Sequence, residues 1–126
     1  MIIDSLKIRD FRNYGEAEMK PHPGVNILFG QNGSGKTNLL EAIHYSALGR
    51  SHRTSQDKEV VRKGAEAAAI GVQLHKSGVR MDVQVKLTPG EIRKKAIFVD
   101  RKRANRLSDL MGHVQCVIFS PEDLML

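Results

Sequence analysis

The chain has 126 residues, about the size of one domain, and its 40% hydrophobic and 27% charged residues are ordinary for a soluble globular protein. No apolar stretch approaches the roughly 20 residues that span a membrane, and residues 1–4 lack the basic and apolar regions of a signal peptide. We therefore expect a cytoplasmic protein. Cys116 is the single cysteine, which excludes a disulfide within the chain.

The chain begins with two predicted strands joined by a turn. Apolar residues recur within residues 3–11 and again at Ala17 and Met19, and turn-forming residues lie between them at 13–15. This pattern predicts an antiparallel pair. A short apolar run at 25–29, introduced by a Pro-Gly turn, predicts a further strand that leads into the next motif.

Residues 30–37 form a complete phosphate-binding loop motif, G-x-x-x-x-G-K-[ST]. Its glycines let backbone N–H groups wrap a triphosphate, its lysine contacts the β- and γ-phosphates, and its threonine hydroxyl binds Mg²⁺. Apolar residues at helical spacing over 37–48, closed by Gly49, predict the helix that this motif requires. The motif predicts a nucleoside triphosphate with Mg²⁺, Thr37 being the metal ligand, held by Gly30, Gln31, Asn32, Gly33, Ser34, Gly35, Lys36 and Thr37.

After this helix the pattern changes to strands. Residues 57–63 are predicted to form a short helix. Residues 79–87 then alternate between apolar and polar, which indicates a half-buried strand, and we expect it to pair with residues 67–74 and 91–99 in an antiparallel meander. The prediction for the whole chain is an α/β fold in which the meander lies beside a parallel core sheet.

Two segments resemble further motifs of nucleotide hydrolases. Residues 96–100 have the form of a Walker B strand that ends in an aspartate, but no glutamate follows, and a hairpin is the favoured alternative. Residues 109–112 match the D-x-x-G of GTPases. No guanine-reading motif accompanies them, and a short helix capped by Ser108 is favoured.

The last residues predict structure that the chain does not complete. Residues 114–119 are predicted to form a buried strand, and Ser120 and Pro121 begin a helix shortly before Leu126. Because the Walker B motif is also missing, we expect a fragment of a longer protein whose catalytic half lies downstream.

Basic residues are gathered in two segments, 50–63 and 93–106. The net charge of +6, from 20 Lys and Arg against 14 Asp and Glu, favours a polyanionic partner. For each segment the alternative, a solvated face of strands and turns, stays open. The candidate residues for contact with nucleic acid are Arg50, Arg53, Arg93, Lys94, Lys95, Arg101, Lys102 and Arg103.

Several stretches carry a resemblance to a known family. Residues 6–14 (LKIRDFRNY) and 32–43 (NGSGKTNLLEAI) look like the SMC-like branch of the ABC ATPases. Within that branch, residues 48–54 (LGRSHRT), 97–100 (IFVD) and 119–124 (FSPEDL) resemble the RecF family of bacterial recombination mediators. The likeness covers essentially the whole chain. It implies the N-terminal lobe of an ABC-type P-loop ATPase head, lobe I, with Walker B, signature motif and arm domain beyond residue 126.

The resemblance also implies a function. RecF-like proteins bind ATP between two heads, so ATP drives dimerisation and DNA clamping at gaps and junctions of single-stranded and duplex DNA. They act with RecR and RecO to help load RecA. By this analogy Arg12 and Asn13 lie beside the nucleotide, and residues 120–122 occupy the Q-loop position. Weak ATPase activity is expected of the full-length dimer, and this fragment, which holds no catalytic residue, should hydrolyse negligibly.

Two hypotheses of different class follow from these observations. The first is an ATP-binding module of DNA repair, and the second is a P-loop small-molecule kinase whose basic residues surround an anionic substrate. The meander favours the first hypothesis, because kinases normally continue with alternating strands and helices.

Overall fold

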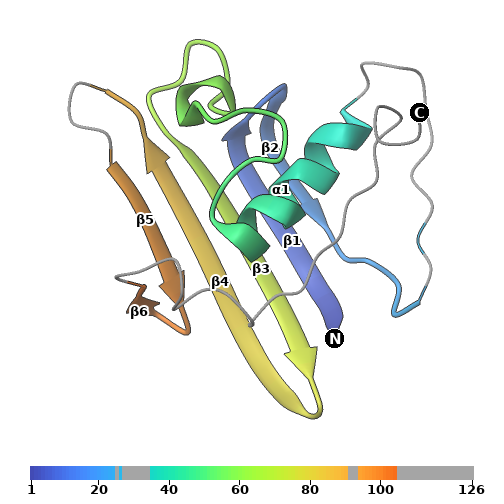
Figure 1. Cartoon of the computed structure of the whole chain (residues 1–126). Coiled ribbons are helices and arrows are strands. Elements are labelled where there is room, and N and C mark those ends of the chain that lie inside the picture. The colour runs from blue at the N-terminus through green and yellow to red at the C-terminus, as the bar shows by residue number, and fades with distance from the viewer. Residues whose placement is uncertain (25, 27–34, 91–93, 105–126) are drawn as a thin grey trace, which may run out of the picture.

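The structure, a computed structural model, describes residues 1–24, 26, 35–90 and 94–104. In this part of the chain six strands form one sheet in the order β2-β1-β3-β4-β5-β6, and every neighbouring pair is antiparallel (Figure 1). The strands are β1 (Ile2–Phe11), β2 (Tyr14–Met19), β3 (Ala68–Lys76), β4 (Val79–Thr88), β5 (Lys94–Val99) and β6 (Lys102–Arg103).

The helix α1 (Lys36–Leu48) lies across one face of this sheet (Figure 1). Alternate residues of the strands point toward it, and the aligned residues Leu6, Val72 and Val83 are at most 1% exposed. From the helix, Ala42 and Tyr45 complete the core with no exposed area. The core therefore lies between α1 and the central strands.

The predicted helix and meander are confirmed. The helix ends where Gly49 takes a left-handed conformation with φ of 72° and donates its N–H to the Tyr45 carbonyl at 2.7 Å. β4 pairs with β3 over residues 79–87 and with β5 over residues 83–88, in the meander that was predicted. Consecutive antiparallel strands of this kind do not fit the kinase hypothesis.

The hairpin alternative for residues 96–100 is also confirmed. β5 runs antiparallel to β4 and returns through Asp100 and Arg101 into β6. The Asp100 carboxylate accepts the Asp82 N–H at 2.9 Å, and the Asp100 N–H donates to the Asp82 carbonyl at 2.8 Å. This aspartate therefore closes a turn.

Two local predictions were wrong. The first turn lies at Arg12 and Asn13, earlier than expected, and Arg12 has a φ of 53°. The predicted helix at 57–63 is only a short 3-10 helix, η1 (Asp57–Glu59). The chain then extends beside the end of β1, because the Arg12 N–H donates to the Val60 carbonyl and the Arg62 N–H to the Asp10 carbonyl, both at 2.7 Å. Tertiary pairing overrides the local helical pattern there.

Several predictions fall outside the described residues. They are the strands at 25–29 and 114–119, which were predicted to form the parallel core sheet, residues 30–34 of the phosphate loop, residue Arg93, the D-x-x-G segment and the helix from Ser120. Among the residues that are described, no helix is long and apolar enough to cross a membrane.

Candidate nucleotide-binding site

The last glycine of the phosphate-loop motif is fixed by an aromatic residue of β2. Gly35 precedes α1 with a φ of 99°, and its carbonyl accepts the hydroxyl of Tyr14 at 3.1 Å. A Cβ at this position would lie 2.6 Å from the Tyr14 oxygen, closer than real Cβ contacts. Both the backbone conformation and the space therefore require glycine.

The start of α1 fits an anionic ligand and a metal-binding hydroxyl. Lys36 opens the helix, Thr37 is exposed in its first turn, and no acidic residue lies in that turn. The N–H groups at a helix N-terminus attract phosphate, and a nearby carboxylate would weaken that attraction. Gly30, Gln31, Asn32, Gly33 and Ser34 lie outside the described residues, so the structure places the last part of the motif only.

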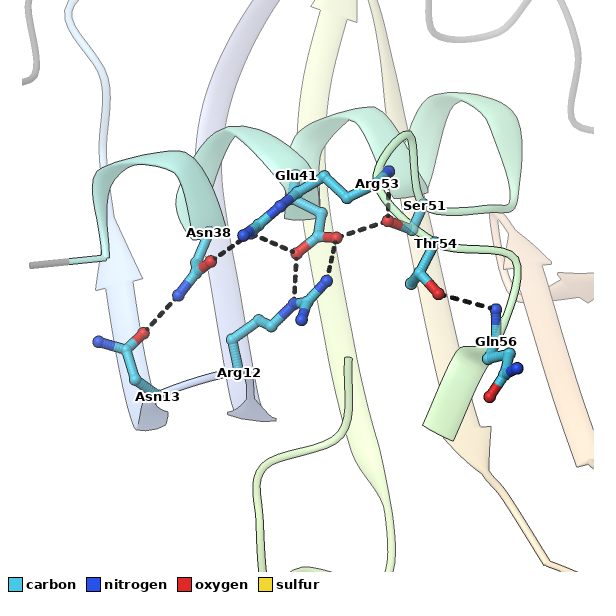
Figure 2. Close-up of polar contacts among 8 residues, drawn as sticks. All are labelled: Arg12, Asn13, Asn38, Glu41, Ser51, Arg53, Thr54 and Gln56. Carbon is cyan, nitrogen blue, oxygen red and sulfur yellow. Dashed lines mark hydrogen bonds and ion pairs between the residues drawn. The ribbon is translucent and has the colours of Figure 1, made fainter. Parts of the chain in front are cut away.

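Arg12 joins the turn between β1 and β2 to the middle of α1. Its Nε and Nη2 donate to the two carboxylate oxygens of Glu41 at 2.8 and 2.9 Å (Figure 2). Glu41 has no exposed area, whereas the Arg12 side chain is 19% exposed. This two-point pairing fixes the plane of the guanidinium group. Among the described residues, no acceptor is recorded for the Nη1 group of Arg12.

Glu41 also anchors the segment that follows α1. The hydroxyl of Ser51 donates to Glu41 Oε2 at 2.5 Å, and Arg53 Nη1 lies 3.5 Å from Oε1 (Figure 2). The Arg53 N–H in turn donates to the Ser51 hydroxyl at 3.0 Å. One buried carboxylate therefore joins two arginines and a serine from separate parts of the chain.

These partners keep Glu41 ionised despite its burial. Burial by itself raises the pKa of a carboxyl group, but the hydrogen bonds from Arg12 and Ser51 and the charges of Arg12 and Arg53 outweigh it, and the pKa of Glu41 is lowered. The hydrogen bond to Glu41 is also the main cause of the raised pKa of Arg12. The pair is therefore charged at neutral pH.

Two amides extend the network toward the start of the helix. Asn38 donates from Nδ2 to Asn13 Oδ1 at 2.7 Å and accepts from Arg53 Nη1 at 2.7 Å (Figure 2). Asn13 is the neighbour of Arg12 in the turn between β1 and β2. The two residues that the resemblance placed beside the nucleotide are thus held against the first two turns of α1.

A pair of histidines also joins α1 to the segment after it. The rings of His44 and His52 meet edge to face with their centroids 5.0 Å apart. Burial, followed by the neighbouring His52, lowers the pKa of His44. A neutral His44 ring at neutral pH is compatible with this close packing.

Glu41, Ser51, Asn38 and Tyr14 are residues of this site that sequence reasoning missed. A signal for Glu41 was available, because it is a carboxylate flanked by apolar residues within 39–43, and a buried charge requires a partner. The identity of the partner was not available, since Arg12 lies 29 positions away.

The candidate residues for DNA contact do not share one environment. Lys95 is engaged by other groups of the protein, with Nζ 2.9 Å from the Gly49 carbonyl, 3.0 Å from Asp57 and 5.1 Å from the centre of the Tyr45 ring. Arg53 belongs to the Glu41 network. Exposed residues in the set are Arg50, Arg53, Arg101, Lys102 and Arg103, and the side chains of Arg93 and Lys94 are not described.

The class of protein follows from a family match and from the fold. The sequence profile of the family described as AAA domain matches residues 5–111, and the chain belongs to this family. A solved structure of an SMC ATPase, reported for ATP-driven dimerisation and DNA-stimulated activation, aligns with a TM-score of 0.77 over 100% of this chain and 85% of that chain. At 19% identity it shows the fold alone. The fold is that of a P-loop, ABC-type ATPase head.

The resemblance to RecF is confirmed for the N-terminal part of that protein. A curated relative from Lactobacillus johnsonii, "DNA replication and repair protein RecF", is 44% identical over 126 residues, 100% of this chain and 33% of the relative. One of the same name from Staphylococcus aureus is 42% identical over 124 residues, 98% of this chain and 33% of the relative. The solved structure of the recombination mediator RecF with ATP aligns with a TM-score of 0.88 and 30% identity over 97% of this chain and 33% of that chain. The chain thus spans about a third of the length of these relatives.

Proposed function

We propose that this chain is the ATP-binding part of a DNA replication and repair protein that acts as RecF does. The observation that carries the proposal is the junction at Gly35, where a phosphate-loop sequence enters α1 and the Arg12 network holds the neighbouring turn. The solved relative with ATP supports the choice of nucleotide. ATP is bound with Mg²⁺, for which Thr37 supplies the hydroxyl ligand.

Each residue of the site has a physical role in this proposal. The backbone N–H groups of the loop and the amine of Lys36 bind the phosphates. Arg12, whose plane is fixed by Glu41, offers its remaining N–H donors to the nucleotide, and Asn13 is oriented by Asn38. Because these donors are already ordered, little conformational entropy is lost when the ligand binds.

In the whole protein, ATP binding brings two heads together and strengthens the binding of DNA at single-strand gaps and junctions. The partners in this proposal are RecR and RecO, with RecA loading as the result, and the location is cytoplasmic. The named function of the curated relatives, DNA replication and repair, supports this assignment. Hydrolysis is weak in the full-length dimer and negligible in this chain alone.

The proposal is tested by the binding of a fluorescently labelled gapped DNA at two salt concentrations, with and without ATP and Mg²⁺. We expect binding that weakens with salt, because phosphate contacts release counterions, and that strengthens with ATP. In the Lys36→Ala variant the effect of ATP should disappear while the salt dependence stays. DNA binding that does not change when ATP is added would contradict the proposal that ATP strengthens the binding of DNA. ATP binding without any binding of DNA would contradict it as well.

A further inference from the structure

A cleft of about 550 Å³ lies between the segment around η1 and the end of β4. One wall carries Lys58, Arg62 and Lys63, and the other is formed by residues 87–90 with Lys95 at the start of β5. The structure thus brings basic residues of both charged segments of the sequence to one cavity.

The charges of this cleft are unbalanced. Lys58, Arg62 and Lys63 are exposed, and the carboxylate that pairs with Arg62 among the described residues, that of Asp10, lies 3.7 Å from its Nη1. Among the described residues that line the cleft, Asp57 is the one acidic residue. It is engaged by Lys95 at 3.0 Å and by the hydroxyl of Tyr45 at 2.6 Å. A positive potential therefore remains at the rim, and an anion would relieve it.

The walls of the cleft are held in place. Asp57 ties η1 to α1 through Tyr45 and to β5 through Lys95. The opposite end of the segment is paired with β1 through the backbone contacts of Val60 and Arg62 at 2.7 Å. A preformed surface of this kind loses little entropy when a ligand binds.

The floor of the cleft is apolar. It includes Val61, 9% exposed, and Leu87, 1% exposed, together with Ala65. Cations above an apolar floor match a ligand that carries phosphates beside apolar C–H groups, as the deoxyribose-phosphate backbone of DNA does. Because the described residues of the cleft offer no tyrosine, tryptophan or phenylalanine, stacking of bases does not suit it.

We propose that this cleft binds the sugar-phosphate backbone of a DNA strand through Lys58, Arg62 and Lys63. The inference rests on the proposed function, which makes DNA the polyanion, and it assigns that contact to residues outside the nucleotide site. The two sites share the segment 60–62, since the Val60 carbonyl accepts from Arg12 while Val61 and Arg62 line the cleft.

The test compares two double variants of equal charge. Lys58→Gln with Lys63→Gln removes two cations from the cleft, and Lys76→Gln with Arg80→Gln removes two exposed cations from the β3–β4 hairpin, at the far end of those strands (Figure 1). Anisotropy of a labelled single-stranded oligonucleotide is measured over a salt series. For the cleft variant, the slope of log K against log salt should fall by about 1.4, which is about 0.7 for each lost phosphate contact. The hairpin variant should keep the slope of the unsubstituted chain.

The possible results distinguish a failure of the cleft proposal from a failure of the proposed function. Equal slopes in the two variants, with DNA still bound by the unsubstituted chain, would overturn the cleft proposal and leave the proposed function standing. No binding of DNA by the unsubstituted chain would overturn both. A labelled oligoglutamate peptide is titrated in parallel. If the cleft substitutions weaken binding of the peptide and leave binding of DNA unchanged, the cleft belongs to an acidic protein segment instead.

Discussion

At the scale of single residues, Gly35 and Gly64 differ in surroundings although both have a positive φ, 99° and 90°. An alanine at either position is strained by the backbone. At Gly35 the new Cβ would also meet Tyr14 at 2.6 Å, whereas at Gly64 no atom lies within 4 Å. Position 35 is therefore restricted to glycine both by its backbone conformation and by the space that Tyr14 fills.

The pair gives a matched prediction. Gly64→Ala should lower the free energy of unfolding by about 1 kcal/mol, from backbone strain alone. Gly35→Ala should lower it by about 3 kcal/mol, because the Tyr14 ring must also move away from the phosphate loop. Urea unfolding of the two variants measures both values. Equal losses would show that Tyr14 does not constrain this position.

At the scale of elements, Glu41 joins three parts of the chain: α1, the turn between β1 and β2, and the segment at 51–53. Glu41→Gln keeps the shape but leaves Arg12 without its charged partner, and we expect a loss of about 3 kcal/mol in the free energy of unfolding at neutral pH. The same substitution at Glu18, whose exposed pair with Lys20 is 4.0 Å long, should change it by less than about 0.5 kcal/mol.

The pKa of Glu41 determines how the stability loss in the Glu41→Gln variant depends on pH. The pKa in the folded protein is below its ordinary value of 4.5, so the stabilisation is complete above that value and is lost as the pH falls through the folded pKa. Unfolding measured between neutral and acid pH should therefore show the Glu41→Gln difference shrinking in acid. A difference that stays constant down to the lowest pH would contradict the ionised pair.

The same elements show which parts of the fold could be predicted from the sequence. α1 and β4 were predictable because their apolar residues repeat at the periods of a helix and a strand. The prediction of a helix at 57–63 was wrong because this segment pairs with β1, and the paired residues are about 50 positions apart in the sequence. The phosphate loop was recognisable as a local motif, whereas the partners of Glu41 depend on how distant segments fold together.

At the scale of the whole molecule, α1 lies between two sites of different chemistry. Its first turn begins directly after Gly35 of the phosphate loop, whose carbonyl accepts the Leu39 N–H at 3.1 Å. Tyr45, farther along the helix, supports the wall of the basic cleft through Asp57. The antiparallel sheet supplies a rigid base for both. This arrangement is compatible with the proposed function, in which bound ATP alters the binding of DNA.

The binding of ATP by this chain is the central claim, and calorimetric titration of ATP with Mg²⁺ tests it most directly. Lys36→Ala should weaken the affinity by on the order of 2 kcal/mol, roughly thirtyfold, because a charge-assisted contact to phosphate is lost. Lys20→Ala, at an exposed site, should bind as the unsubstituted chain does. If the chain binds no ATP, or if the Lys36→Ala variant binds it equally well, this account of the site is contradicted.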